Sequence, residues 1–338
     1  MSRTPVRTVF LGSGEFAVPV LDALCTLPVI RLVAVVTAPP RGAGRGHRPR
    51  PTRVASRADE LGVGPVLCPA RLRDPDSVAA LEALSPGLLV LADYGQIVPS
   101  SLLSLPLHRA LNLHPSLLPR HRGASPIQEA ILAGDHETGV TLMVMDEGLD
   151  TGPVVAQVAL PLDGTETAPD LEMRLAAEAG ALLAAVLPGW LLGGRTATAQ
   201  PAGGSTLTRP LRRDDGRIDP SRPAYRLERQ VRALQPWPGS WVDTPGGRLT
   251  LWRVRALSLS ATGGATSGTF TLTDPTEGAE PAGDAPPLGI LVPDGDGLAL
   301  RVADGALRLD EVQLAGGRRM TSAELRRGHP GLVGTGVS

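Results

Sequence analysis

The chain has 338 residues, of which 42% are hydrophobic and 20% are charged. This length is sufficient for two domains. The formal net charge of -1 excludes a uniformly basic chain, so any contact with nucleic acid must come from a local patch. All basic side chains other than histidine are arginines. Because the sequence contains no lysine, catalysis through a lysine Schiff base is excluded.

Cysteine usage and the first residues of the chain indicate the compartment. Cys25 and Cys68 stand in apolar surroundings without metal-ligand spacing, so we expect buried, reduced thiols. Residues 1–14 lack the long apolar region of a signal peptide. The apolar run 179–187 is too short to span a bilayer. These features predict a soluble, cytoplasmic protein.

Apolar strand-like runs alternate with helix-like segments through the first part of the chain. The expected strands cover residues 6–11, 32–37, 66–68, 88–92 and 110–114. The expected helices between them cover residues 16–27, 52–61 and 77–84. This alternation predicts a parallel sheet with helices on both faces. Such sheets bind ligands beyond the carboxyl ends of their strands.

Two β-like runs within residues 139–162, joined by EGLDTG, continue this pattern. A long alanine- and leucine-rich helix follows at about residues 168–192. We therefore expect one α/β domain over residues 1–195.

The composition changes after this helix. Residues 196–212 belong to a stretch rich in Gly, Pro, Thr and Arg, which predicts a linker. Closely spaced short strands with turn signals then predict a small β-barrel domain over residues 213–334. The acidic, low-complexity stretch 275–287 is expected to form a mobile loop within that barrel.

A glycine turn follows the first expected strand. FLGSGEFA, residues 10–17, has the strand, Gly-x-Gly and helix pattern of a dinucleotide-binding turn. The acidic residue expected about 20 residues later is missing, because the second strand ends in VVTAPP. An NAD-linked oxidoreductase is therefore a weaker alternative, and a tight turn that packs against a neighbouring loop is the plainer interpretation.

Two polar residues stand at the end of the expected strand 110–114. Asn112 and His114 are two residues apart and so lie on the same face. An amide and a protonated imidazole both donate hydrogen bonds, and two converging donors can stabilise an oxyanion. No nucleophile motif accompanies them, which indicates direct attack by a substrate nucleophile on a bound carbonyl. Capping of nearby backbone groups explains the spacing equally well.

The loop MDEGLDTGPV, residues 145–154, can bring a carboxylate back to the strand ends. A carboxylate there would orient His114, favour its charged form and act as a general base. Asp146, Glu147 and Asp150 compete for this role, and each could instead be a plain turn former. The local pattern does not choose between them.

Arginine is concentrated in two stretches. Residues 41–57, RGAGRGHRPRPTRVASR, carry six arginines and no acid, after the second expected strand. This loop projects from the same sheet edge as the candidate site and favours a polyanion over a plain solvated loop. Residues 209–232 carry eight arginines against four acids, between the two domains. The histidines show no metal spacing, so no metal is expected.

Together these motifs resemble the formyltransferase family. NLHPSLLPRHRGASPIQ (112–128) resembles its signature Asn-x-His-x-Ser-Leu-Leu-Pro-x-x-Arg-Gly, and ETGVTLMVMDEGLDTGPV (137–154) resembles its second motif. GAGRG (42–46) resembles the insertion loop of the methionyl-tRNA formyltransferases within that family. Residues 215–241 and 295–320 resemble the start and end of their C-terminal domain, so the resemblance covers nearly the whole chain.

The resemblance implies a Rossmann-like catalytic domain and a C-terminal OB-like β-barrel that contacts tRNA. The implied reaction transfers the formyl group of 10-formyltetrahydrofolate to the methionine amine of initiator methionyl-tRNA. The resemblance assigns catalysis to Asn112, His114 and Asp150. The residues implied for folate binding are Ser116, Leu117, Leu118, Pro119, Tyr94 and Ile97, and those for tRNA binding are Arg41, Arg45, Arg48 and Arg50. The family is typically monomeric.

The sequence departs from the family at a few positions. His47 and Arg48 stand where the loop usually carries lysines, and Pro220 replaces a common tryptophan. A sugar-nucleotide N-formyltransferase is an alternative with the same trio and a second domain, whereas a glycinamide formyltransferase lacks that domain. A non-catalytic tRNA-binding scaffold would use the basic loop without the trio. The basic loop favours tRNA over a small sugar nucleotide.

Overall fold

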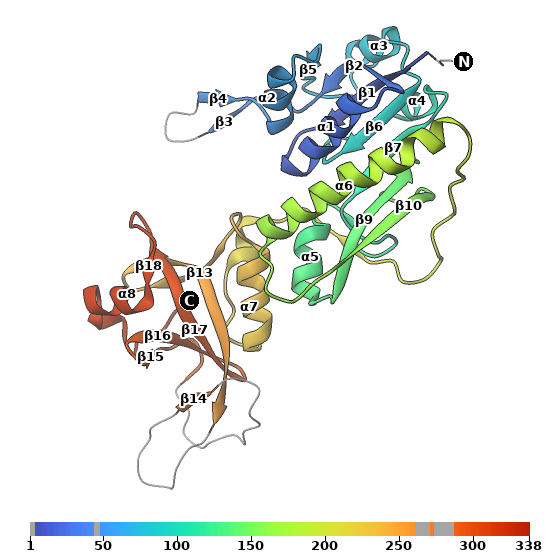
Figure 1. Cartoon of the computed structure of the whole chain (residues 1–338). Coiled ribbons are helices and arrows are strands. Elements are labelled where there is room, and N and C mark those ends of the chain that lie inside the picture. The colour runs from blue at the N-terminus through green and yellow to red at the C-terminus, as the bar shows by residue number, and fades with distance from the viewer. Residues whose placement is uncertain (1–3, 44–47, 261–270, 274–286) are drawn as a thin grey trace, which may run out of the picture. The chain divides into compact units, whose positions relative to one another are not determined.

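The chain folds into two compact units (Figure 1). The computed structural model describes residues 4–43, 48–260, 271–273 and 287–338. Unit 1 comprises Met1–Ala130, His136–Asp163 and Asp170–Arg209. Unit 2 comprises Ile131–Asp135, Gly164–Pro169 and Pro210–Ser338. The stretch expected to be a mobile loop, 275–287, lies outside the described residues except for its last position.

Unit 1 is built on a seven-stranded sheet in the order β10-β9-β7-β6-β1-β2-β5. Its strands are β1 (Val6–Gly12), β2 (Ile30–Val36), β5 (Val66–Leu67), β6 (Leu88–Ala92), β7 (Ala110–His114), β9 (Glu137–Val144) and β10 (Val154–Pro161). Five neighbouring strands of the sheet, β5, β2, β1, β6 and β7, are parallel, as predicted. β9 is antiparallel to both β7 and β10. β6 is buried along its whole length, which explains why its sequence, LLVLA, is continuously apolar.

The order of the strands reverses beside β1. The chain first adds β2 and β5 on one side of β1 and then β6 and β7 on the other. In open α/β sheets, ligands bind at the carboxyl ends of the strands where the order reverses. This point lies between the ends of β1 and β6 and is one strand away from Asn112 and His114 on β7.

The helices of unit 1 follow the expected segments, with a short 3-10 turn (Glu15–Ala17) before the first. They are α1 (Val18–Thr26), α2 (Arg53–Glu60), α3 (Pro75–Ala83), α4 (Ser100–Ser104), α5 (Pro126–Ala133), which ends in unit 2, and α6 (Ala168–Leu191), which begins there. By length and composition α6 could cross a membrane. However, Leu171, Leu175 and Leu183 on one of its faces are fully buried, as in a core helix.

Two predictions about unit 1 need correction. The arginine-rich loop contains a two-stranded antiparallel ribbon, β3 (Arg41–Ala43) with β4 (Arg48–Arg50). The prediction of buried thiols is wrong, because Cys25 and Cys68 are both exposed. Cys25 follows the buried Leu24 on α1 and faces outward, and Cys68 follows β5 at the edge of the sheet.

Unit 2 contains an antiparallel sheet in the order β12-β13-β17-β16-β15. In addition, β14 pairs with β13, and β18 pairs with β17. Its strands are β12 (Ser240–Thr244), β13 (Gly247–Ser260), β14 (Thr271–Thr273), β15 (Leu291–Asp294), β16 (Gly297–Val302), β17 (Gly305–Leu314) and β18 (Met320–Thr321). Its helices are α7 (Ala224–Ala233) and α8 (Ser322–Gly328), with 3-10 turns at Arg213–Gly216 and Pro330–Leu332. This sheet is consistent with the expected β-barrel, and an OB-like topology remains a prediction.

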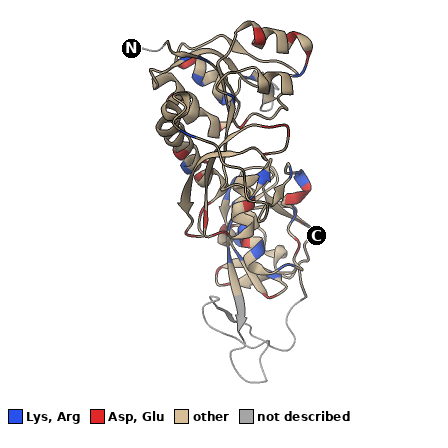
Figure 2. Cartoon of the chain, turned by 90° about the vertical axis from the view of Figure 1, so that its right-hand side faces the viewer, with Lys and Arg blue, Asp and Glu red and all other residues tan. Residues whose placement is uncertain are grey.

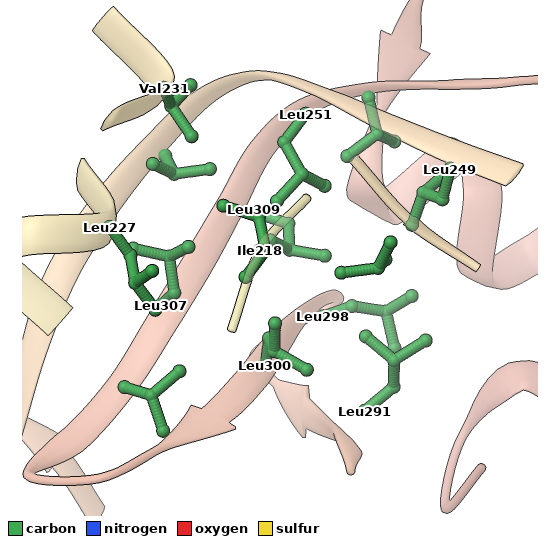
Figure 3. Packing of buried hydrophobic residues seen from close by; sticks show 14 of the residues in the cluster. Ile218, Leu227, Val231, Leu249, Leu251, Leu291, Leu298, Leu300, Leu307 and Leu309 are labelled. Carbon is green, nitrogen blue, oxygen red and sulfur yellow. The ribbon is translucent and has the colours of Figure 1, made fainter. Parts of the chain in front are cut away.

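The core of unit 2 is made of aliphatic side chains (Figure 3). Leu307 and Leu309 of β17 stand on either side of the half-buried Arg308 and are almost completely buried. Leu227 and Val231, four residues apart on α7, belong to the same core. Figure 2 shows that acidic and basic residues are interspersed in this view, in keeping with the net charge of -1.

The stretch expected to be a linker, residues 196–212, is divided between the two units after Arg209. Its first part is attached to unit 1 by backbone hydrogen bonds. Thr198 exchanges two of them with Val154, and β11 (Leu207–Thr208) pairs in parallel with β8 (Arg122–Gly123). This part of the chain therefore runs beside the candidate catalytic residues.

Candidate active site

Asn112 and His114 lie at the carboxyl end of β7, between β6 and β9. Asn112 is in register with Leu91 on β6 and with Met143 on β9. His114 is buried, whereas Asn112 is half-buried. Within the described residues, the side-chain amide of Asn112 makes no hydrogen bond. Its two N–H groups are therefore available to a bound molecule.

The two ring nitrogens of His114 have different partners. Nε2 lies 2.9 Å from the backbone carbonyl oxygen of His121. Because a carbonyl oxygen can only accept, Nε2 carries the proton of the neutral ring. Nδ1 faces Oδ2 of Asp150 at 3.6 Å. Burial lowers the pKa of His114, and the nearby Asp150 carboxylate opposes this shift.

Asp150 lies in the loop between β9 and β10. Its φ of 53° is in the left-handed region, which is uncommon for a residue with a Cβ. Its Oδ2 accepts a hydrogen bond of 2.8 Å from the backbone N–H of Gly123. The left-handed turn thus directs the carboxylate toward both His114 and the loop after β7.

The other two carboxylates of this loop lie elsewhere. Asp146 accepts hydrogen bonds from the Gly148 backbone at 3.1 Å and from the Thr151 hydroxyl at 2.8 Å, so it forms the turn itself. Glu147 is exposed. Of the three candidates that the sequence left open, Asp150 is the one beside His114.

Ser116 and Leu118, two of the residues implied for folate binding, are buried in the loop after β7. The Ser116 hydroxyl donates to the Arg120 carbonyl at 2.6 Å. The Leu118 backbone bonds to the side chains of Thr141 and Gln157 at 3.1 and 2.9 Å. These two residues therefore shape the loop, whereas Leu117 and Pro119 are half-buried.

Tyr94 and Ile97 follow β6, next to the point where the strand order reverses. The Tyr94 hydroxyl is buried and has no hydrogen-bond partner within the described residues. Burial raises the pKa of Tyr94 to about 12. Ile97 is 85% exposed. A buried donor without a partner and an exposed apolar side chain are features of a ligand-binding edge.

Sequence reasoning missed Asp93, the first residue after β6. The residue is exposed as a whole, but its carboxyl group is turned toward Gly14, where an added Cβ would lie 1.8 Å from Oδ2. Desolvation of this carboxyl group, with Glu172 nearby, raises the pKa of Asp93 to about 6. Its place at the reversal of strand order was the available signal.

The residues implied for tRNA binding lie on the β3–β4 ribbon. Arg41 is paired with Arg50 across the ribbon, and Arg48 is paired with Ala43. Arg50 is exposed. Arg45 lies outside the described residues. Elsewhere in the described chain, no three His, Cys, Asp or Glu side chains are placed to hold a metal ion.

Comparison with known proteins identifies the family. The formyl transferase family model matches residues 6–187, and the model of the formyl transferase C-terminal domain matches residues 210–330. The methionyl-tRNA formyltransferase of Magnetococcus marinus is 39% identical over 96% of this chain and 96% of its own length. That of Rhizorhabdus wittichii is 41% identical over 98% of this chain and 97% of its own length.

Solved structures show the same fold at low sequence identity. WlaRD, a sugar 3N-formyl transferase crystallised with dTDP and 5-N-formyl-THF, has a TM-score of 0.61 and 15% identity, covering 91% of this chain and 97% of its own. HypX from Aquifex aeolicus, in complex with tetrahydrofolic acid, has a TM-score of 0.59 and 17% identity, covering 96% of this chain and 47% of its own. The chain therefore belongs to the formyl transferase family and, within it, to the methionyl-tRNA formyltransferases.

Proposed function

We propose that the protein transfers the formyl group of 10-formyltetrahydrofolate to the α-amino group of methionine on initiator methionyl-tRNA, which gives formylmethionyl-tRNA for translation initiation. One observation carries the proposal. A free carboxamide, Asn112, and a paired imidazole and carboxylate, His114 and Asp150, lie at one strand end in a chain of this family.

The folate donor fits the edge formed by the loops after β6 and β7. Its polar heterocycle would give the buried Tyr94 hydroxyl the partner that it lacks within the described residues. Leu117, Pro119 and Ile97 offer apolar surface for the rings. When bound, the donor supplies the formyl group, and the residues of the chain do the rest.

The methionine amine is the nucleophile. An α-amino group has a pKa of about 7.7–8.0, so it needs little help to become neutral. Its lone pair forms the bond to the formyl carbon while the carbonyl electrons move to oxygen. Asn112 donates to this oxygen as charge develops. His114 can also donate to it, but only through Nδ1 and only once that nitrogen has taken up a proton, because Nε2 is already bonded to the His121 carbonyl.

The proton that the amine loses is held by the pair formed by Asp150 and Nδ1 of His114. It then passes to N10 of the folate as the bond between N10 and the formyl carbon breaks. The carboxylate is acceptor-only when ionised, so Asp150 also keeps the ring in one orientation. No covalent enzyme intermediate and no metal take part in this route.

The tRNA is held by its phosphates. The arginines implied for this contact follow β2 in the sequence and would supply the charge for it; they are Arg41, Arg45, Arg48 and Arg50. Residues 213–334 provide a second tRNA-contacting domain. We further expect a cytoplasmic protein that acts as a monomer, as the resemblance to its family implies.

Single-turnover transfer from 10-formyltetrahydrofolate tests the proposal. Charged initiator tRNA, uncharged initiator tRNA and a 4-amino sugar nucleotide are offered as separate acceptors. We expect formylation of the charged tRNA alone. Transfer to the sugar nucleotide would overturn the proposal in favour of the sugar-nucleotide alternative, and oxidation of a reduced nicotinamide would favour the oxidoreductase. Arg50→Ala should weaken tRNA binding and reduce the slope of binding against salt by about 1.

A further inference from the structure

We propose that Gln200 is a positioning residue for Asp150, and that residues 198–208, here called the clamp segment, hold together the two loops that meet at His114. The inference rests on the proposed function, because it assigns Asp150 a part in formyl transfer. The clamp segment lies within the stretch whose composition predicts a linker.

All the polar groups of the Gln200 side chain are engaged. Its amide nitrogen donates to the carbonyl oxygens of Asp150 at 2.7 Å and Gly152 at 2.8 Å. Its amide oxygen accepts from Nε and Nη2 of Arg122 at 3.1 and 2.6 Å. A flipped amide would face two carbonyls with an oxygen and a guanidinium with an NH₂ group. The orientation of Gln200 is therefore fixed by its partners.

Gln200 joins the two loops that contact His114. Arg122 is flanked by His121, whose carbonyl holds Nε2 of the ring, and by Gly123, whose N–H holds the Asp150 carboxylate. The two carbonyls that accept from Gln200 are that of Asp150 itself, the left-handed residue, and that of Gly152, two residues later. The Gln200 side chain thus holds two parts of the site in place. One is the loop whose His121 carbonyl accepts from the His114 ring, and the other is the turn that carries the Asp150 carboxylate.

Small movements matter at this point. The 3.6 Å between Nδ1 of His114 and Oδ2 of Asp150 is longer than a hydrogen bond, so the pair has to close slightly to share a proton. Asp150 also has a φ of 53°, a conformation that other contacts must hold. A shift of the turn away from His114 would slow proton transfer without removing any substrate-binding group.

The rest of the clamp segment is attached independently of Gln200. Thr198 exchanges two backbone hydrogen bonds of 2.8 Å with Val154. The Thr206 hydroxyl accepts from the His121 N–H at 2.8 Å. The Thr208 carbonyl approaches Gly123 so closely that an added Cβ would lie 2.3 Å from its oxygen. Substitution of Gln200 alone leaves these contacts in place, so the variant is expected to fold.

Gln200→Ala tests the inference, with Gln200→Glu as the near-isosteric variant. Gln200→Glu keeps an acceptor for Arg122 but loses the donors to the two carbonyls. A matched control is Gln230→Ala, because Gln230 also donates to two backbone carbonyls, those of Asp215 and Arg217 in unit 2. The measurements are kcat and KM for both substrates, and the NMR titration of His114 in each variant.

We expect kcat to fall about 10-fold in Gln200→Ala and Gln200→Glu, with KM values within about twofold of wild type. Two titratable groups act on the ring, Asp150, which raises its pKa, and His121, which lowers it. If Asp150 moves away, the pKa of His114 falls. It should fall in both Gln200 variants and stay at the wild-type value in Gln230→Ala.

Wild-type kcat and an unchanged His114 titration in Gln200→Ala would overturn the inference and leave the proposed function standing. An unchanged titration with a lower kcat would also overturn it, because Gln200 would then act by another route. If the wild-type protein transfers no formyl group to charged tRNA, the proposed function fails. The His114 titration would still decide whether Gln200 sets the position of Asp150.

Discussion

The carboxyl end of β7 in unit 1 and the middle of β17 in unit 2 use polar side chains differently. On β17, Arg308 lies between two buried leucines and pairs with Asp294 of β15. On β7, Asn112 is half-buried and makes no hydrogen bond within the described residues. Nearby, the His114 ring is separated from its carboxylate by slightly more than a hydrogen-bond length.

This difference separates a structural sheet from a functional strand end. A strand such as β17, where Arg308 is paired and the leucines beside it are buried, gains stability from each of these contacts. A strand end that keeps a donor unpaired forgoes some of that stability and has a group ready for a substrate. Substitutions in unit 2 should therefore change stability, and substitutions at the end of β7 should change rates.

Leu307→Ala should have the largest effect on stability. Leu307 is fully buried in the core of unit 2. Removing its side chain leaves a cavity, and the free energy of unfolding should fall by about 2–5 kcal/mol. Denaturant unfolding followed by tryptophan fluorescence measures it, because Trp237, Trp241 and Trp252 all lie in unit 2.

The matched control is Leu288→Ala, at a leucine that is 48% exposed, where the loss should be much smaller. Equal losses at the two leucines would mean that the packing of unit 2 is not what stabilises it. At a temperature where Leu307→Ala is still folded, its kcat should match the wild-type value.

Asn112→Ala should lower kcat and leave stability almost unchanged, the reverse of what Leu307→Ala does. Loss of one donor to an oxyanion costs about 2.7–4 kcal/mol, so kcat should fall about 10²–10³-fold. The free energy of unfolding should change little, because the Asn112 amide makes no hydrogen bond within the described residues. Single-turnover kinetics and denaturant unfolding of the same preparation measure both. A variant that unfolds more easily but keeps its kcat would make Asn112 a structural residue and remove the contrast with unit 2.

The parts of the fold that were predictable are those specified by local pattern. β6 is continuously apolar because it is buried on both faces, and α6 has a leucine-rich face. The β3–β4 ribbon was not predictable from its Gly- and Pro-rich sequence, because pairing across the ribbon holds it. The apolar residues around Cys25 did not tell which face of α1 the thiol would occupy.

The site divides in the same way. The shared face of Asn112 and His114 follows from strand periodicity alone. The choice of Asp150 over Asp146 depends on how one turn closes, and the local sequence does not specify that. Gln200 contacts residues 50 and 78 positions away, so no local pattern could have identified it. That Nε2 of His114 is already bonded to a carbonyl likewise required the fold.

Asp150→Asn should change how the stability of the protein depends on pH, through the pKa of His114. Burial lowers the pKa of His114, so below the ordinary value of about 6.5 the unfolded chain takes up a proton that the folded one resists. Stability therefore falls as the pH drops from about 6.5 toward the folded pKa. Asp150→Asn removes the attraction that opposes burial, so the pKa falls further and the loss extends to lower pH. NMR titration of His114 checks the direction, and a raised pKa in the variant would contradict it.

Arg319→Ala should have the smallest effect. The Arg319 guanidinium lies 3.4 Å from the centre of the Trp252 ring, on the exposed side of unit 2. An exposed cation–π contact contributes about 0.5–1 kcal/mol, so the free energy of unfolding should fall by that amount. Arg318→Ala is the control, because it removes the same charge from the neighbouring position, where Arg318 pairs with Glu324. A surface ion pair of this kind contributes about 0–1 kcal/mol.

The salt dependence of the stability loss in the two variants distinguishes stacking on an aromatic ring from a simple charge interaction. The loss in Arg318→Ala should shrink as ionic strength rises, because salt screens an exposed ion pair. The loss in Arg319→Ala should persist, because the guanidinium also covers the indole face of Trp252. If both losses vanish in salt, the arginines of unit 2 contribute charge alone. In that case the exposed face of this sheet would be stabilised by the aliphatic core beneath it.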